Sequence, residues 1–160
     1  MAEASGSDDG RGFELPLLMF AGFRVILDEL HAELRREGHP DVRPAYGFAL
    51  QAVGIGGATA TEIGQRLGVS KQAAGKTVDR LEALGYVERG DDPNDGRRKV
   101  VRLSGRGIDV LVRSAAIFDR LHGEWARKLG ADRLAEVEGA LREAVPGDFF
   151  RLDAVSWFSG

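Results

Sequence analysis

Cysteine is absent from this sequence of 160 residues, and so is any uninterrupted apolar run approaching the roughly 18 residues that a membrane span requires. The absence of cysteine excludes disulfide bonds, thiolate metal ligands and thiol-based redox sensing. The first residues, Met1 to Ser5, also lack the basic and apolar regions of a signal peptide. The sequence therefore predicts a cytoplasmic protein without a membrane partner.

Candidate metal and catalytic groups are equally scarce. The three histidines, His31, His39 and His122, lie far apart in the sequence, so no close pair of them predicts a metal site. The glycine cluster at residues 54–57 follows an expected helix, whereas a phosphate-binding glycine loop follows a strand. The sequence has no nucleophile elbow and no paired catalytic spacing. We expect neither an enzyme nor a protein that carries a cofactor or a metal.

The charge of the chain is unevenly distributed. Its net charge of -3 argues mildly against nucleic acid, because binding to phosphates needs a local positive potential. Between Arg66 and Arg106, however, ten basic residues face six acidic ones, which gives this segment +4 and leaves -7 for the rest. A basic centre between acidic flanks suits a DNA-binding protein, although an uneven solvated surface can give the same division.

The first third of the chain predicts a tail and two helices. The length and the hydrophobic content of 43% suit one compact domain, and the polar, glycine-rich residues 1–12 predict a disordered tail. From Phe13 to Arg36 apolar residues recur at steps of three and four, which predicts a helix that ends at Gly38-His39-Pro40. Its apolar face consists of Met19, Phe23, Ile26, Leu30 and Leu34. A shorter helix is expected from Asp41 to Gly54.

Two helices joined by a tight turn are expected next. Thr59-Ala60-Thr61-Glu62 fits a capping box, which starts a helix that ends at Gly68. Ser70 can cap a second helix that ends near Leu84-Gly85, so the pattern is that of a helix-turn-helix. The residues expected to face the core are Val69, Ala73, Val78, Leu81 and Leu84.

A β-hairpin and two more helices complete the expected fold. Residues 86–89 and 99–103 are short β-prone runs around a charged loop, residues 90–98. From Ser104 one long helix is expected, with an apolar stripe at Ile108, Leu111, Ala115, Phe118, His122, Trp125 and Leu129. A further helix follows Gly130 and is closed by Pro146-Gly147.

The order helix, turn, helix and hairpin predicts a winged helix-turn-helix, whose second helix lies in the major groove of DNA. Gln72 can bond to an adenine edge, Lys76 can reach guanine acceptors, and Ala73 can touch a thymine methyl group. Ser70, Lys71 and Arg80 can hold phosphates. Any one of these residues alone would suit a solvated helix surface equally well, and the prediction depends on their ordered combination.

A family resemblance covers roughly residues 13–145. The stretch S-K-Q-A-A-G-K-T-V-D-R-L-E-A-L-G-Y-V-E-R (Ser70 to Arg89), followed by D-P-N-D-G-R-R-K-V-V-R-L-S-G-R-G (Asp92 to Gly107), closely resembles the recognition helix and wing of MarR (multiple antibiotic resistance regulator) proteins. The resemblance implies that Asp95 braces the wing, that Arg97 enters the minor groove, and that Arg98, Lys99 and Thr59 complete the DNA contacts. Arginine is favoured in narrow minor grooves.

The resemblance also implies a homodimer formed by the first and last helices, residues 13–40 and 104–160, around a DNA-binding lobe at residues 41–103. Members of the family commonly bind small aromatic or phenolic anions, and a pocket for such an effector would include Phe23, Tyr46, Phe118, His122 and Trp125. The alternative is that His122 is a hydrogen-bonded core histidine of an ordinary dimer interface. The aromatic tail after Gly147 is expected to pack on the dimerisation region.

These observations predict a mainly α-helical fold with a small β-hairpin wing. The expected function is that of a transcriptional regulator, in the form of a ligand-responsive repressor, that binds a pseudo-palindromic double-stranded operator as a homodimer. A winged helix used only for contact with other proteins is the alternative, because a fold does not determine a function. The basic wing and Lys76 favour DNA, since a module that binds only proteins has no physical need of them.

Overall fold

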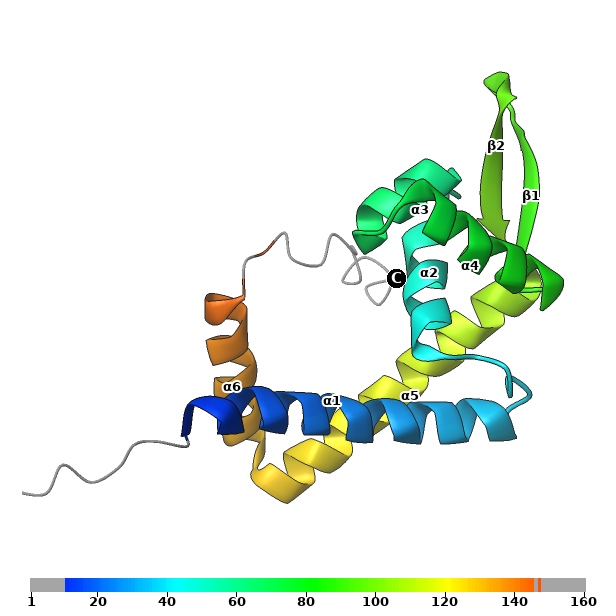
Figure 1. The fold of residues 1–160 in the computed structure, drawn as a ribbon. Coiled ribbons are helices and arrows are strands. Elements are labelled where there is room, and N and C mark those ends of the chain that lie inside the picture. The colour runs from blue at the N-terminus through cyan, green and yellow to red at the C-terminus, as the bar shows by residue number, and fades with distance from the viewer. Residues whose placement is uncertain (1–10, 146, 148–160) are drawn as a thin grey trace, which may run out of the picture.

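The computed structural model describes residues 11–145 and residue 147, which form six helices and one hairpin (Figure 1). In chain order the elements are α1 (Arg11–Arg36), α2 (Pro44–Val53), α3 (Ala60–Leu67), α4 (Lys71–Ala83), β1 (Val87–Asp92), β2 (Asp95–Leu103), α5 (Gly105–Leu129) and α6 (Ala131–Ala144). The mainly helical fold with a hairpin wing that the sequence predicts is therefore confirmed.

The ends of α3, α4 and α5 are set by local hydrogen bonds. The Thr59 hydroxyl accepts from the Glu62 backbone N–H, and the Glu62 carboxylate accepts from the Thr59 backbone N–H, so the predicted capping box is present. Gly68 ends α3 in the left-handed region, with φ 67°. The hydroxyls of Ser70 and Ser104 cap α4 and α5 in the same manner. These caps place the turn between α3 and α4 where the sequence predicts it.

The wing is longer than the sequence predicts. Strands β1 and β2 pair antiparallel from Val87↔Leu103 to Asp91↔Lys99, and Asp92 then pairs with Asp95. Backbone pairing therefore continues into residues 90–92 and 95, within the segment 90–98 that we expected to form a loop, because ladder hydrogen bonds do not require apolar side chains. The three residues between Asp95 and Lys99 have no partner on β1 and bulge from the ladder.

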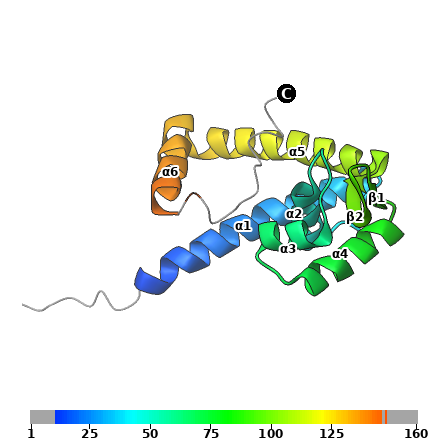
Figure 2. The same ribbon diagram turned by 90° about the horizontal axis from the view of Figure 1, so that it is seen from above.

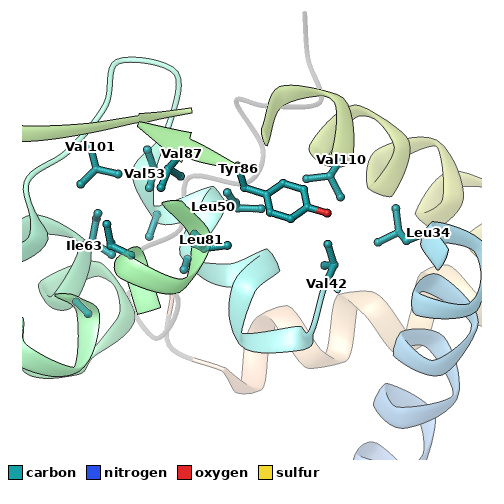
Figure 3. Close-up of a cluster of buried hydrophobic side chains, with 14 of the residues drawn as sticks. Leu34, Val42, Leu50, Val53, Ile63, Leu81, Tyr86, Val87, Val101 and Val110 are labelled. Carbon is teal, nitrogen blue, oxygen red and sulfur yellow. The ribbon is translucent and has the colours of Figure 1, made fainter. Parts of the chain in front are cut away.

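A single apolar core joins the wing to the helices (Figure 3). Its fully buried side chains come from α1 to α5, from both strands and from Tyr86 just before β1. They include Leu34, Leu50, Val53, Ile63, Val78, Leu81, Tyr86, Val87, Val101 and Val110. Figure 3 shows the Tyr86 ring between Leu50 and Val110, with its hydroxyl directed toward Leu34 and Val42. Tyr86 therefore lies where the core of the lobe meets α1 and α5.

Helices α1, α5 and α6 extend away from this lobe, and two views show α6 at the end opposite the wing (Figures 1 and 2). Large apolar side chains on these helices are exposed in the single chain, and Phe13 is the most exposed of those on α1 at 78%. The others are Leu15, Leu17, Leu18, Met19, Phe20, Phe23 and Val25 on α1, Ile108, Val112 and Leu129 on α5, and Val137 and Leu141 on α6. The predicted helices are present, and this surface is what a dimerisation region would offer.

Four sequence predictions need correction. Helix α1 begins at Arg11, so Arg11 and Gly12 do not belong to the expected tail, whose other residues lie outside the described part. On α4 the predicted core residues Val78 and Leu81 are buried, but Ala74 is buried in place of Ala73, and Val69, which precedes the helix, is 45% exposed. A helix turned by one residue has the same apolar spacing, so the spacing alone could not fix which face is buried.

The same error of one residue occurs on α5. Its buried positions are Gly107, Val110, Ile117 and Leu121, each next to a position of the predicted stripe. His122 is consequently exposed in the single chain, with 59% of its side-chain surface accessible, and it is not part of the buried stripe. The aromatic tail, Phe149, Phe150, Trp157 and Phe158, lies outside the described residues.

Candidate nucleic-acid interface

The first turns of α4 carry a polar, exposed surface. Lys71, Gln72, Ala73 and Lys76 are all exposed, and the Ser70 hydroxyl accepts from the Ala73 backbone N–H at 3.1 Å. Ala73 is thus free of the core and available for contact with a thymine methyl group, which agrees with its predicted role but not with its predicted burial. The first turn of a helix also carries a partial positive charge, which favours a nearby phosphate.

An open groove of about 590 Å³ joins this helix-turn-helix to the wing. The groove brings together residues that are far apart in the sequence: Thr59, Ala60, Thr61, Glu62, Gln65, Lys71, Arg97, Arg98 and Lys99. Five of these, Thr59, Lys71, Arg97, Arg98 and Lys99, are predicted DNA contacts. The fold therefore places the start of α3, the start of α4 and the wing around one basic concave surface.

Several basic side chains near the groove are held by acidic partners. Arg98 lies 3.5 Å from Glu62, and Lys99 forms an ion pair with Asp91 across the wing. Arg89 donates to Asp79 and to Glu82, each at 2.6 Å, and so ties the base of the wing to α4. These pairs partly neutralise the positive charge of the surface that would face a phosphate backbone.

Four predicted contacts keep their charge uncompensated. Within residues 11–145 the structure shows no ion pair for Lys71, Lys76, Arg80 or Arg97, and all four are exposed. Lys76 lies on α4 and Arg97 lies in the bulge of β2, so the free cations come from the helix and from the wing. This arrangement can neutralise DNA phosphates at two separated places.

The wing tip is shaped by two aspartates. The Asp92 carboxylate accepts from the Asn94 backbone N–H at 2.9 Å, and the Asp95 carboxylate accepts from the Arg97 backbone N–H at 3.1 Å. Such side-chain bonds two residues along the chain hold a turn in one conformation. Asp95 thereby fixes the backbone that presents the Arg97 side chain.

Glu62 is the acidic residue of the groove. Hydrogen bonds from the Thr59 backbone and from the Thr59 hydroxyl lower the pKa of the Glu62 carboxyl, and the positive charges of Arg98 and Arg66 act in the same direction. Glu62 therefore remains negative at neutral pH. Its charge offsets part of the positive potential of the groove and holds Arg98 near α3.

Two structural residues of this region were missed by sequence reasoning. A Cβ on Gly64 would lie 2.9 Å from the Val69 carbonyl oxygen, so only glycine allows the close approach of α3 to the chain before α4. The second is Arg89, which connects the wing to α4 by forming ion pairs with Asp79 and Glu82. The spacing of those two acids by three residues on one helix face was the signal that could have identified Arg89.

The five predicted effector-binding residues do not form one group around a described pocket. Tyr46 and Phe118 pack against the buried core of the lobe. Phe23 is 47% exposed, and Trp125 lies near Gly22, where an added Cβ would be 3.5 Å from Cη2 of the tryptophan. His122 forms a hydrogen bond of 2.9 Å with Glu138 of α6. The structure thus places Tyr46 in the lobe, Phe23 on α1, and the other three residues on α5.

Within the part of the chain that the structure describes, no three or more His, Asp or Glu side chains gather as potential metal ligands. None of the described helices is both long enough and apolar enough to cross a membrane.

Comparison with known proteins gives one family. A family model described as MarR family matches residues 41–98. The multiple antibiotic resistance protein MarR of Escherichia coli is 33% identical over 89 residues, and the match covers 55% of this chain and 62% of the relative. An uncharacterised HTH-type transcriptional regulator of Bacillus subtilis, YcgE, is 51% identical over 43 residues, which cover 27% of this chain and 28% of the relative. The chain thus matches less than two thirds of the length of these curated relatives.

Solved structures agree over a larger part of the fold. A mutant E. coli MarR in complex with operator DNA superposes with a TM-score of 0.68 at 25% identity, covering 88% of this chain and 100% of that chain. Streptococcus pneumoniae FabT in complex with DNA superposes with a TM-score of 0.71, covering 82% of this chain and 92% of that chain. At 16% identity, FabT supports only the likeness of fold.

Proposed function

This chain belongs to the MarR family, and from that premise we propose that it is a sequence-specific regulator of transcription that binds double-stranded DNA as a homodimer. The observation that carries the proposal is the basic groove between α3, α4 and the wing. It presents Lys71 and Arg97 on facing elements, and both are exposed and without an acidic partner within residues 11–145.

The two sides of this surface suit two grooves of DNA. Helix α4 has the length and the polar first turns of a recognition helix, so Gln72, Ala73 and Lys76 would meet base edges in the major groove. The wing would then place Arg97 in the adjacent minor groove, where the negative potential favours arginine. Lys71, Arg80, Arg98 and Lys99 would hold phosphates and set the orientation. The likeness to an E. coli MarR in complex with operator DNA supports this arrangement.

The apolar surface of α1, α5 and α6 supports the proposal of a homodimer. Eight large apolar side chains of α1 alone are at least 45% exposed, which is more than a monomeric globular protein of this size would keep in contact with water. A two-fold axis through these helices would place two copies of α4 about one DNA turn apart, which suits a pseudo-palindromic operator.

The remaining parts of the proposal concern regulation. We propose repression that responds to a small aromatic or phenolic effector, held near Phe23, His122 and Trp125. An effector of this kind would act by favouring a dimer whose recognition helices have the wrong separation. The protein would work in the cytoplasm, where its DNA is, and without an enzymatic activity of its own.

Selection from a pool of randomised duplex DNA tests the function. The expected result is an enriched sequence with two inverted half-sites about 10 base pairs apart. Lys76→Ala should lower the affinity for that sequence by about 1–3 kcal/mol and relax the preference at one position of each half-site. Lys128→Ala is the matched control, because Lys128 is an exposed lysine at the end of α5, far from the groove.

The same experiment distinguishes DNA binding from the alternative function. A protein that uses its winged helix only for contact with other proteins would enrich no sequence from the pool. Equal binding of Lys76→Ala and of the parent protein to the enriched DNA would also remove α4 as the reading element.

A further inference from the structure

A chain of polar contacts passes through the junction between the DNA-binding lobe and α5. His39, in the connection between α1 and α2, is the one buried polar or charged side chain among the described residues and is only 3% exposed. Its Nδ1 lies 3.0 Å from the Tyr86 hydroxyl, and its Nε2 lies 2.8 Å from the Asp109 carboxylate. One imidazole ring thus bridges the base of the wing and the second turn of α5.

The partners of His39 determine its tautomer. The Asp109 carboxylate can only accept, so Nε2 carries a proton and donates to it. In a neutral ring Nδ1 then accepts from the Tyr86 hydroxyl. A hydrogen bond from Arg113, followed in size by the one from His39, lowers the pKa of the Asp109 carboxyl, which keeps this acceptor charged. Each atom of the bridge therefore has a defined donor or acceptor role.

Two arginines extend the network to α1. Arg106 donates to the Gly38 carbonyl at 3.1 Å and to the Tyr86 hydroxyl oxygen at 3.2 Å, and its guanidinium lies 4.7 Å from the centre of the tyrosine ring. Arg113 donates at 2.8 Å both to Asp109 and to Glu37, which follows α1. The network therefore ties together the end of α1, the α1–α2 connection, the base of the wing and the start of α5.

The position of Tyr86 links this network to the DNA-reading surface. Tyr86 follows α4 directly after Gly85, its backbone N–H donates to the Leu81 carbonyl at 2.9 Å, and its own carbonyl accepts from Ser104 at 3.0 Å. Any shift of the Tyr86 ring would therefore act on the last turn of α4 and on the first turn of α5 together. The ring is fully buried and cannot move independently of its surroundings.

We propose that His39 is a positioning residue for DNA binding, and that its bridge from Tyr86 to Asp109 fixes the angle between the recognition helix α4 and the helix α5. The physical reason is that the apolar contacts of the junction are not directional, whereas hydrogen bonds to a buried imidazole ring impose distances and angles. The consequence for operator spacing rests on the proposed function, because only a dimer translates this angle into a separation of two α4 helices.

Tyr86→Phe tests the proposal, because it removes only the hydroxyl and keeps the buried ring. Tyr46→Phe is the matched control, since Tyr46 is half-buried in the same lobe and its hydroxyl makes no hydrogen bond within residues 11–145. Equal far-ultraviolet circular dichroism of both variants and the parent would establish that the fold is retained.

The angle itself can be measured without DNA. The chain contains no cysteine, so Ala73→Cys on α4 and Lys128→Cys at the end of α5 provide the only two sites for spin labels. Doubly labelled chains are diluted with an excess of unlabelled protein, and pulsed electron paramagnetic resonance gives the α4–α5 distance within one chain. We expect a broader or shifted distance distribution in Tyr86→Phe and a parental one in Tyr46→Phe. A parental distribution in both variants would overturn the proposal.

A second measurement uses unlabelled protein and DNA with altered half-site spacing. Tyr86→Phe loses the hydrogen bonds of the hydroxyl with His39 and with Arg106. Relative to the parent, it should therefore bind the preferred spacing at least about fivefold more weakly and discriminate less against one added base pair. If the parent binds no DNA but the distance distribution changes in Tyr86→Phe, the proposed function fails and the positioning role stands. If the parent binds DNA and Tyr86→Phe keeps its distance distribution and spacing preference, the positioning role fails alone.

Discussion

Gly107 lies so close to the backbone of Tyr86 that its position has no room for a Cβ atom. It lies in the first turn of α5, where a Cβ would clash with the Tyr86 carbonyl oxygen and would lie 3.2 Å from the Tyr86 carbonyl carbon. The obstacle is backbone and cannot turn away as a side chain could. The Tyr86 carbonyl also accepts from Ser104, so moving it would disturb the start of α5.

We therefore expect Gly107→Ala to lower the free energy of unfolding by about 1–3 kcal/mol, the range of an overpacked core. Thermal melting followed by circular dichroism measures the change. Gly105→Ala is the control, because Gly105 lies in the same turn and its Cβ would meet nothing within 4 Å. A melting temperature of Gly107→Ala equal to that of Gly105→Ala would contradict the close approach of Tyr86 and α5.

Asp109 gives a pH dependence with a defined sign. Hydrogen bonds from Arg113 and then from His39 lower the pKa of its carboxyl in the folded protein. Because the folded pKa lies below the unfolded one, this stabilisation is present above the unfolded pKa of about 3.9 and is lost as the pH falls through the folded value.

The melting temperature should therefore decrease less steeply below about pH 4 in Asp109→Asn than in the parent, because the variant has already lost the charged acceptor. Melting curves between about pH 2.5 and 7 measure this. Asp119→Asn serves as the control, since Asp119 is exposed on the same helix and makes no ion pair within residues 11–145. Parallel curves for Asp109→Asn and the parent would show that the carboxylate does not stabilise the fold.

At the scale of the element, α3 depends strongly on its cap. It has only eight residues, so it is too short to be stable alone, and its N-terminus lies at the wall of the groove. The Thr59 hydroxyl accepts from Glu62 N–H at 3.2 Å and donates to the Glu62 carboxylate at 2.9 Å. Removal of this hydroxyl affects both bonds.

Thr59→Ala should cost about 0.5–2 kcal/mol of folding free energy, as is usual for a lost N-cap. Chemical denaturation measures this cost, and an unchanged slope would show that the folded state is otherwise intact. Thr61→Ala is the matched control, because Thr61 lies in the same turn and its hydroxyl makes no hydrogen bond within residues 11–145. Equal midpoints for the two variants would mean that the capping box does not hold α3.

Helices that begin at a capping residue could be predicted from the sequence, whereas the way in which they pack could not be predicted fully. The caps at Thr59, Ser70 and Ser104 act within a few residues, so their side chains identify the helix starts directly. Val78 and Leu81 of α4 were predicted correctly, but Ala73 and the buried positions of α5 were each predicted one residue away, because the choice between neighbours such as Ala73 and Ala74 is made by tertiary contacts. The sequence pattern located the helices along the chain but did not determine fully which face of each helix is buried.

The candidate site was predictable to a similar extent. Lys71, Arg97 and Arg98 were identified from the order of motifs, and the structure places all three at one groove. The network of His39, Tyr86 and Asp109 was not predicted, because its members are separated by up to 70 residues and no local pattern relates them. Long-range polar contacts of this kind become visible only when the chain is folded.

At the scale of the whole molecule, one half of the chain would read DNA and the other half would pair two chains. The lobe with α2, α3, α4 and the wing shares one buried core with α1 and α5, whereas other faces of α1, α5 and α6 leave an apolar surface exposed. The polar junction around His39 lies between the two halves. This division agrees with the net charge of +4 between Arg66 and Arg106 and with the exposed apolar side chains of α1, α5 and α6.

The salt dependence of DNA binding is the most direct test of the proposed interface, because basic side chains of both the wing and α4 should contact DNA phosphates. The dissociation constant is measured by fluorescence anisotropy, on the selected sequence and on scrambled DNA, for the parent, for Arg97→Ala and for Arg127→Ala at the far end of α5. Arg97→Ala should weaken binding to both DNAs and flatten the slope of log affinity against log salt by about 0.9 for each phosphate charge that Arg97 neutralises, doubled in a dimer. Arg127→Ala should match the parent. Unchanged affinity and slope for Arg97→Ala on both DNAs would contradict the proposed interface.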